Sequence, residues 1–391
     1  MKVELNIYSL MFIALLPNFM FIPSITVLAD HYETNFSIMQ LSVSLYMVAS
    51  ASLQVLLGPL SDKYGRRPVL IACLLTLIIA SLGCVFSPST EIFFLFRIMQ
   101  ATAVSGMVIG RAIVIDVFHQ KDSVKILSKI AIVLGISSIL GPAIGGILIE
   151  TYSWQAIFYF IIGIGMFSFF YNFFSLEETN KYLVKNLSDQ MDNYKKLMSS
   201  SRFWAYSFIG GFSSSTFFTI LISIPYIGEI IYGLSSFQSS LLLIIITSGF
   251  ILGSLSSPIL LGLFSEKKVL YFSMLSSIAG ALISFVLYII FPQYILSIFS
   301  PFFLIGLSNG FISPIALSKV LSIRDDSRGA ASGLNGAFII GFGALYSAIG
   351  GYFLGYIERV EIIYFMIFSS LILTYISILH TDEFKHSSLK K

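Results

Sequence analysis

The sequence predicts an all-α integral membrane protein with twelve transmembrane helices. Hydrophobic residues make up 56% of its 391 residues and charged residues only 11%, whereas about a quarter of a soluble domain is charged. The charged residues lie in short clusters. The apolar stretches between them run for about 20 residues, which is the length that crosses a hydrocarbon core of about 30 Å as a helix. Because hydrocarbon offers no water to backbone groups, such stretches must be helical.

Turn residues mark several ends of these stretches. They include Ser87-Pro88-Ser89, Phe291-Pro292-Gln293 and the connection from Pro225 to Gly233, which are residue types that interrupt helices. The expected helices, in chain order, are 6–29, 38–60, 69–87, 90–113, 126–149, 152–175, 203–226, 236–261, 269–291, 294–320, 330–355 and 358–379.

Most of the positive charge falls on one side of this topology. With an even number of spans both chain ends share a side, and 21 of the 23 Lys and Arg residues then lie there. Arg359 lies on the other side, and Arg97 lies within the fourth helix. Positive residues are retained in the cytoplasm, so we expect a multi-pass protein of a bacterial inner membrane with both termini cytoplasmic. Charges that only solvate turns would show no such asymmetry.

Two short motifs each occur once in both halves of the chain, and the separation between the two copies is nearly the same for both motifs. This repetition indicates a duplicated six-helix unit. GPLSDK at 58–63 follows the second helix, and GLFSEK at 262–267 follows the eighth. AIGG occurs at 143–146 in the fifth helix and at 348–351 in the eleventh. Chance similarity of short Gly-rich pieces is the alternative. The expected domains are an N-terminal six-helix bundle at 1–176, a cytoplasmic linker at 177–202, and a C-terminal six-helix bundle with a short cytoplasmic tail at 203–391.

The loop after the second helix is the sharpest motif. It carries Gly58, Asp62, Gly65, Arg66 and Arg67, and it resembles the signature loop of the major facilitator superfamily. The resemblance implies two six-helix halves with pseudo-two-fold symmetry and a binding site between them near the midplane. It also implies that Asp62 and Arg66 latch the halves at the cytoplasmic face and release as the transporter changes state. The alternative is a simple positive-inside anchor, which the three basic residues of the loop would satisfy without its glycines and its acid.

A charge lies inside the fourth helix. Arg97 is about six residues beyond Glu91, hence roughly 9 Å deep, and Gln100 follows on the same face. A charge at such a depth is a functional candidate. Arg-x-x-Gln here is similar to the second motif of the superfamily, which implies a role in proton coupling or substrate binding. The alternative is that the side chain snorkels to the outer headgroups.

The fifth helix combines Gly141, Pro142, Gly145 and Gly146. This pattern is similar to the antiporter motif of drug exporters, although small residues also serve ordinary helix packing. Three further segments narrow the resemblance to the bicyclomycin-resistance (Bcr/CflA) type of drug exporter. These segments are QVLLGP at 54–59, GRA at 110–112 followed by Asp116, and WQAIF at 154–158.

An acid that this subfamily commonly carries in its first helix is absent, since the corresponding stretch reads NFMFIP at 18–23. No carboxylate lies near the middle of any predicted span. We therefore expect Asp30 or Glu91 to pair with Arg97 near the outer mouth and to exchange it for a proton. If Arg97 is the one buried charge, the cavity is positive or neutral and favours neutral or anionic substrates.

Other polar residues in the spans are candidates to line the cavity, and each is equally compatible with a helix-to-helix hydrogen bond. The candidates are Asn18, Tyr46, Gln54, Asn309 and Asn335.

These observations predict a secondary active transporter rather than an enzyme. The expected function is proton-coupled export of drug-like small molecules by alternating access. The alternatives are a dedicated transporter of a native solute, such as a siderophore or another neutral or anionic metabolite, and a membrane-embedded enzyme or scaffold. We expect no cofactor, with the proton gradient as energy source, and no metal site, because the four His residues lie far apart. The expected partners are the substrate, protons and the lipid bilayer, with no nucleic acid, and the expected state is a monomer.

Overall fold

A computed structural model describes residues 2–118, 120–180, 194–323, 328–357 and 359–388, and these ranges contain helices and no strand. The chain divides into two compact units, residues 1–193 (unit 1) and 194–391 (unit 2). The predicted linker at 177–202 spans this division, and its residues 181–193 lie outside the described residues.

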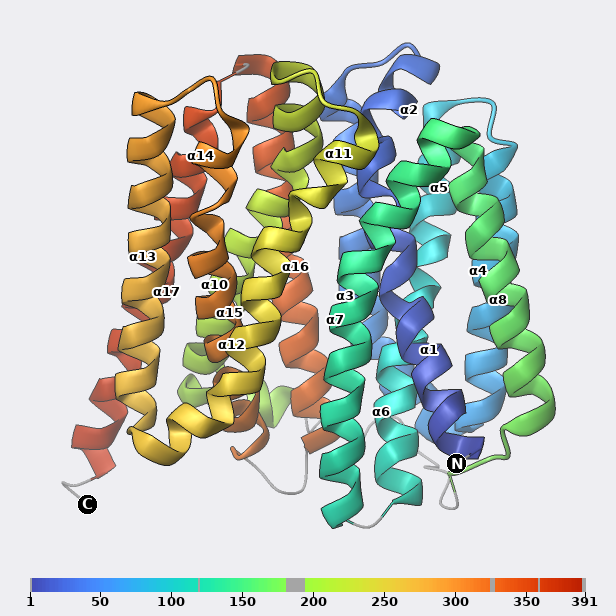
Figure 1. The fold of residues 1–391 in the computed structure, drawn as a ribbon. Coiled ribbons are helices and arrows are strands. Elements are labelled where there is room, and N and C mark those ends of the chain that lie inside the picture. The colour runs from blue at the N-terminus through green and yellow to red at the C-terminus, as the bar shows by residue number, and fades with distance from the viewer. Residues whose placement is uncertain (1, 119, 181–193, 324–327, 358, 389–391) are drawn as a thin grey trace. The chain divides into compact units, whose positions relative to one another are not determined.

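Unit 1 holds the first six predicted helices, two of them interrupted (Figure 1). The chain leaves the first α-helix at Phe19 and resumes after a short 3₁₀ turn, and the fourth predicted helix contains a second 3₁₀ turn. The elements are α1 Lys2–Phe19, η1 Ile22–Ser24, α2 Ile25–His31, α3 Phe36–Tyr64, α4 Arg66–Val85, α5 Thr90–Gln100, η2 Ala101–Val104, α6 Ser105–Val117, α7 Gln120–Thr151 and α8 Gln155–Ser175.

Unit 2 holds the other six predicted helices. The seventh ends in a π-helical stretch, and the eighth and tenth each begin with a short separate helix. The elements are α10 Ser201–Pro225, η3 Tyr226–Ile231, α11 Ser236–Leu241, α12 Leu243–Leu263, α13 Glu266–Ile290, α14 Ile295–Phe299, α15 Phe302–Leu321, α16 Arg328–Ile357 and α17 Glu361–Ser388.

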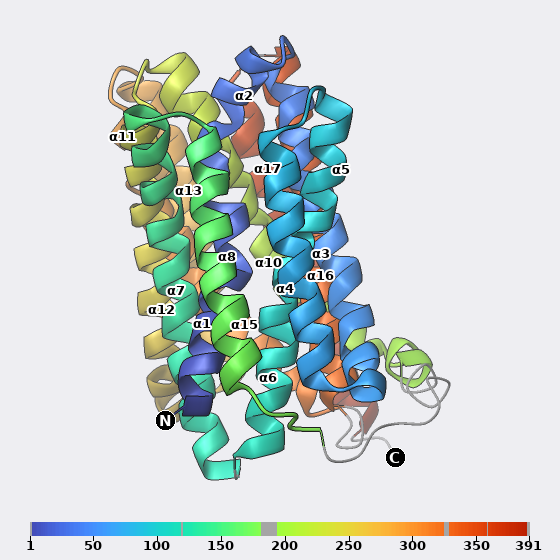
Figure 2. The same ribbon diagram turned by 90° about the vertical axis from the view of Figure 1, so that its right-hand side faces the viewer.

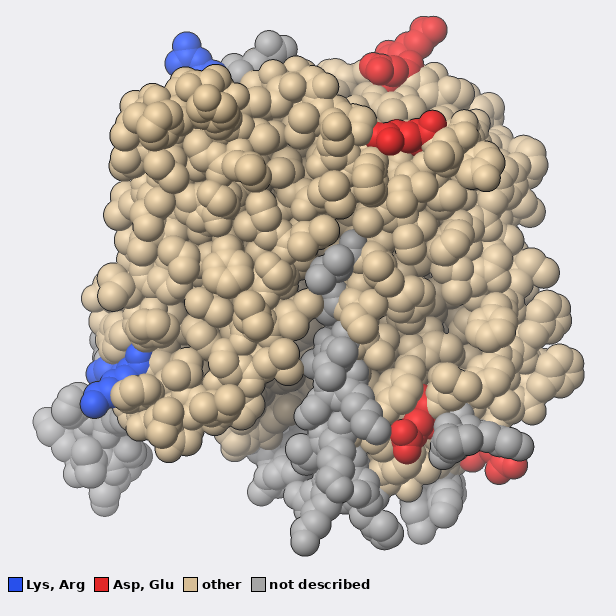
Figure 3. All heavy atoms as spheres, in the orientation of Figure 1, with Lys and Arg blue, Asp and Glu red and all other residues tan. Residues whose placement is uncertain are grey.

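The predicted all-helical membrane fold is confirmed. Among the described residues, eleven helical segments are long and apolar enough to cross a membrane. The remaining predicted span lies in α7, where the apolar stretch Ile136–Thr151 is shorter. Figure 3 shows that, on the face it presents, described charged side chains gather at the two ends of each unit and leave a broad band between them free of charge. This distribution fits a hydrocarbon layer around the band.

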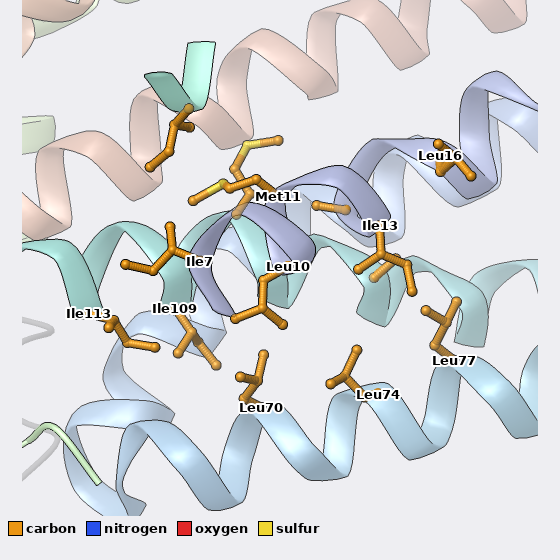
Figure 4. Packing of buried hydrophobic residues seen from close by; sticks show 14 of the residues in the cluster. Ile7, Leu10, Met11, Ile13, Leu16, Leu70, Leu74, Leu77, Ile109 and Ile113 are labelled. Atoms are coloured by element: carbon orange, nitrogen blue, oxygen red, sulfur yellow. The ribbon is translucent and has the colours of Figure 1, made fainter. Parts of the chain in front are cut away.

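Helix α1 forms the centre of unit 1. Its side chains Ile7, Leu10 and Ile13 are fully buried and belong to one cluster with leucines of α4 and isoleucines of α6 (Figure 4). A helix that is apolar on every side is one that neighbours surround completely. Helices α4 and α8 run side by side along the same unit (Figure 2).

Glycines bring the neighbouring helices to the backbone of α1. A Cβ at Gly106 of α6 would overlap the carbonyl oxygen of Leu10, and one at Gly145 of α7 would overlap that of Met20. A Cβ at Gly141 would lie 2.8 Å from the Cβ of Phe19. Because lipid tails are as apolar as the helices, such close packing is a main source of helix association in a bilayer. The helix-five glycines Gly141 and Gly145 therefore pack directly against the end of α1.

We expect Gly145→Ala to destabilise unit 1 by about 1–3 kcal/mol, because the added methyl group overpacks against the backbone of α1. The measurement is the thermal-unfolding midpoint of the purified protein in detergent. Gly163→Ala is the matched control, since a Cβ at Gly163 of α8 meets nothing within 4 Å. Equal midpoints for the two variants would contradict the close approach of α7 to α1.

Candidate functional site

Arg97 lies near the C-terminal end of α5, and its side chain is fully buried. Its guanidinium carbon lies 3.9 Å from the ring centroid of Phe21 and 4.7 Å from that of Tyr46. The rings of Phe21, which follows α1, and Tyr46 of α3 thus present their faces to the cation. Cation–π contacts of this kind contribute about 2 kcal/mol or more when they are desolvated.

Hydrogen bonds hold one end of the guanidinium. Nη1 donates to Oε1 of Gln100 and, over 3.3 Å, to the backbone carbonyl oxygen of Pro17. Gln100 in turn donates from Nε2 to Oγ of Ser81 on α4 at 2.8 Å. Arg97 and Gln100 meet because residues three apart share a face of a helix. The alternative, that Arg97 snorkels to the outer headgroups, does not fit a side chain that is fully buried.

The carbonyl of Pro17 is available because α1 ends at Phe19. The carbonyls in the last turn of a helix have no partner within it, and they carry partial negative charge. Arg97 thus lies at a helix C-terminus created inside the bundle. The glycines Gly141 and Gly145 pack against Phe19 and Met20, so the helix-five motif supports the same end of α1.

Among the described residues of unit 1, several buried donors and acceptors have no hydrogen-bond partner, two of them on Arg97 itself. Nε and Nη2 of Arg97 are buried without a hydrogen bond, and the same holds for Oδ1 of Asn18 and Nε2 of Gln54. An unneutralised charge at this depth costs several kcal/mol. A planar guanidinium with open donors is suited to bind a carboxylate, a phosphate or a carbonyl group. The arrangement can therefore hold an acceptor group of a ligand.

The predicted pairing of Arg97 with Asp30 or Glu91 is not formed in this structure. Both carboxylates are exposed at the ends of their helices, and neither forms an ion pair with Arg97 within the described part of the chain. The physical reason for Glu91 is helical geometry, since residues six apart point about 120° away from each other. The buried partners of Arg97 are neutral groups instead.

The remaining cavity candidates fall in both units. Tyr46, Asn18 and Gln54 are buried in unit 1, with Tyr46 in contact with Arg97. In unit 2, Asn309 donates from Nδ2 to Oγ of Ser213 at 3.1 Å, which is a bond between α15 and α10. Asn335 of α16 is buried, and its Oδ1 has no partner.

The loop between α3 and α4 contains a charged network. Arg66 forms an ion pair with Asp62, contacts Oδ2 of Asp116 at 3.1 Å and donates to Oγ of Ser61 at 2.6 Å. Gly65 turns the chain at φ 99°, a conformation that favours glycine.

The other loop residues have separate roles in this structure. Arg67 donates to the carbonyl oxygen of Phe173 at 2.8 Å and lies over the ring of that residue. No described atom lies within 4 Å of the position of a Cβ at Gly58.

Glu178, which the sequence did not indicate as a site residue, completes this network. Its Oε1 accepts from the backbone N–H of Arg66 at 2.9 Å, and its Oε2 accepts from that of Arg67 at 3.1 Å. Glu178 thereby caps the N-terminus of α4, where N–H groups lack partners within the helix. A carboxylate more than a hundred residues away along the chain gives no local signal of such a contact.

Arg111 is a second cation, which belongs to the GRA segment at 110–112 and for which the sequence analysis predicted no role in a site. It lies in α6, within the membrane-spanning segment that also holds Arg97, and it is half-buried. No side-chain partner for it occurs among the described residues.

Unit 2 has a counterpart of the loop network. Nζ of Lys319, at the end of α15, forms an ion pair with Oε2 of Glu266, at the start of α13. Glu266 stands in the second GPLSDK-like motif at the place of Asp62. Within the described residues there is no cluster of three or more His, Cys, Asp or Glu that would hold a metal ion.

This fold and its buried polar site define the class of the protein. It is a multi-pass membrane transporter for small molecules and not an enzyme. More narrowly, the chain belongs to the Major Facilitator Superfamily, whose family model matches residues 7–348. The predicted superfamily is therefore confirmed.

The chain is similar to several bacterial transporters. It is 26% identical over 346 residues to YdgK of Bacillus subtilis (strain 168), an uncharacterized MFS-type transporter, covering 85% of this chain and 84% of that one. It is 28% identical over 278 residues to the multidrug transporter MdfA of Yersinia pestis bv. Antiqua (strain Angola), covering 70% and 68%. It is 26% identical over 341 residues to a chloramphenicol resistance protein of Pseudomonas aeruginosa, covering 86% and 78%.

Solved structures share the fold at low sequence identity. A D-xylose-proton symporter superposes with a TM-score of 0.72 at 14% identity, over 96% of this chain and 95% of that one. The human organic anion transporter MFSD10 (TETRAN) superposes with a TM-score of 0.71 at 14% identity, over 97% and 98%. At such identities the likeness concerns the fold alone.

We expect Arg97→Met to unfold at a temperature no lower than that of the unchanged protein. The apolar side chain removes a buried charge with open donors, and such replacements are often neutral or stabilising. Arg97→Ala, which also leaves a cavity, should cost about 2–5 kcal/mol. Thermal unfolding in detergent measures both. A clear loss of stability in Arg97→Met would mean that Arg97 supports the fold rather than a ligand.

We expect Glu178→Ala to destabilise unit 1 by about 1 kcal/mol, the usual cost of losing a helix cap. The neighbouring, exposed Glu177 provides the matched control, Glu177→Ala. Thermal unfolding and the rate of proteolytic cleavage in the linker are the two measurements. An unchanged midpoint and cleavage rate would show that the cap contributes nothing.

Proposed function

We propose that the protein is a secondary active transporter that exports drug-like small molecules in exchange for protons, by alternating access. Its place would be the inner membrane of a bacterium, with both termini in the cytoplasm, and it would act as a monomer without a cofactor. Support comes from the superfamily and from two relatives, one described as a multidrug transporter and the other as a chloramphenicol resistance protein. The charge distribution along the sequence supports the orientation.

The observation that carries the substrate class is the buried Arg97 with its open donors. Its partners are a carbonyl, an amide and two aromatic rings, so its positive charge remains uncompensated by any described carboxylate. The half-buried Arg111 adds a second positive charge to the membrane-spanning segment that holds Arg97. We infer that the substrates carry an acceptor group, either neutral or anionic, and that lipophilic cations bind poorly.

The proposed gate is the loop that holds Asp62 and Arg66. Its ion pairs join a buried guanidinium to two partly exposed carboxylates, and they would break and reform as the transporter alternates between states. The glycines of α7 would assist by keeping α1 in place during this change.

Glu229 is the proton carrier that we propose, since the pairing expected for Asp30 and Glu91 does not occur. It lies in the π-helical stretch at the end of a membrane-spanning segment, and its side chain is half-buried. π-helical turns are rare in proteins, and many of those that occur lie at functional sites.

A dedicated transporter of one native solute is the second candidate function. The missing acid of the first helix and the positive charge of Arg97 favour it, because a siderophore or an anionic metabolite offers the carboxylate or carbonyl groups that a guanidinium binds. The number of unrelated compounds that the protein moves separates the two candidates.

Everted, respiring vesicles that contain the protein provide the test. The pH gradient is recorded by a quenched fluorescent amine while chloramphenicol-like neutral compounds, organic anions and lipophilic cations are added in turn. We expect neutral compounds and anions to restore fluorescence and cations to have little effect. Asp62→Asn and Glu229→Gln should abolish the signal, whereas Lys268→Gln at equal abundance should leave it unchanged.

Gln100→Glu tests the charge argument within the same assay. The new carboxylate would neutralise Arg97, so we expect half-saturating concentrations of anions to rise at least about tenfold, which corresponds to about 1.4 kcal/mol, and those of neutral compounds to change less. Equal effects on both classes would contradict a role for the charge of Arg97 in selection. No response to any compound would contradict multidrug export and leave the dedicated transporter.

A further inference from the structure

Unit 2 contains a cavity of about 370 Å³, separate from the site around Arg97. It lies where α10 and α13 begin and where α15 and α17 come to their ends. Its polar lining includes Arg202, Glu266, Lys267 and Lys319. We call this cavity the basic pocket. The positive-inside distribution predicts that this end of unit 2 faces the cytoplasm.

The described side chains that line the basic pocket carry three positive charges and one negative charge. Glu266 forms an ion pair with Lys319. Arg202 is exposed and contacts no acidic side chain within the described residues. Lys267 lies 5.6 Å over the ring of Tyr271. The formal charges of these described side chains sum to +2, and an anion would find several donors among them.

The lining is amphipathic. Besides the cations it presents the hydroxyl groups of Ser200 and Thr381 and the apolar side chains of Leu270 and Ile378. Large apolar residues of the neighbouring α12 end, among them Leu263 at 71% exposure, face outward. Figure 3 shows basic side chains at the lower edge of unit 2, just below the uncharged band. A ligand at this level would have a charged group in the pocket and apolar parts beside the bundle.

We propose that the basic pocket binds the phosphate-bearing headgroup of an anionic phospholipid of the cytoplasmic leaflet. Anionic lipids are attracted to basic residues at the membrane surface, and basic pockets between membrane helices bind such headgroups. The phosphate accepts hydrogen bonds from Arg202 and Lys267, and the acyl chains lie along the apolar surface of the helices. A bound headgroup would join the ends of four helices of unit 2. Inorganic phosphate offers the same chemistry without the acyl chains, so the experiment must separate the two.

The first part of the test uses the full-length protein, purified in a neutral detergent. Thermal unfolding is followed by tryptophan fluorescence while dioleoylphosphatidylglycerol, dioleoylphosphatidylcholine or inorganic phosphate is added, and bound lipid is counted by native mass spectrometry. A ligand that binds the folded state raises the unfolding midpoint. We expect saturable stabilisation by phosphatidylglycerol alone, with one tightly bound molecule. Equal stabilisation by both lipids, or by phosphate, would overturn the proposal.

The second part compares two double variants of equal net charge. Arg202→Gln with Lys267→Gln removes two cations of the pocket. Lys268→Gln with Arg359→Gln removes a neighbouring cation that does not line the pocket and a cation far away along the chain. We expect the first pair to raise the half-saturating concentration of phosphatidylglycerol at least about tenfold and the second pair to change it less than about twofold. Similar losses in both pairs would mean unspecific attraction by surface charge and would overturn the proposal.

Discussion

The contact between Arg97 and the end of α1 is the interaction on which the site depends. A guanidinium buried in a helix bundle needs compensation, and here it comes from a helix C-terminus rather than from a carboxylate. The carbonyl of Pro17 is open only because α1 stops at Phe19. That end in turn stays in place because Gly141 and Gly145 let α7 approach its backbone. Two motifs that are far apart in the sequence thus serve one local arrangement.

Compensation by dipoles and rings leaves the charge of Arg97 available in a way that a salt bridge would not. An ion pair would cancel the charge within the protein, and a substrate would have to compete with the carboxylate for it. Carbonyl, amide and aromatic partners stabilise the cation and still leave Nε and Nη2 open. The loop around Arg66 shows the opposite design, since two carboxylates and a hydroxyl group surround that guanidinium. The partners of Arg66 hold its guanidinium in place, whereas Arg97 keeps two donors open for a ligand.

Predictions from the sequence held where the interacting residues are close along the chain or where composition alone decides. Apolar stretches determine the spans, and a spacing of three residues places Gln100 beside Arg97. The ion pair between Asp62 and Arg66 was not predicted, although the two residues are only four apart. The pairing of Arg97 with Glu91 failed because a separation of six residues turns the two side chains apart. The contacts with Pro17, Phe21 and Tyr46 depend on packing between helices. The cap that Glu178 forms on α4 also depends on contacts between distant parts of the chain. No local sequence pattern predicts these contacts.

The ion pairs at the corresponding ends of the two units bear on the history of the chain. In unit 1 an arginine bridges two acids, Asp62 and Asp116. In unit 2 Glu266 meets Lys319 directly, and Leu270 occupies the place that corresponds to Arg66. At the separation that relates Asp62 to Glu266, the residue that corresponds to Asp116 is Val320, and Lys319 precedes it. If both units arose from one ancestral half, each has therefore kept an ion pair between this loop and the fourth helix of its half, although different residues form it.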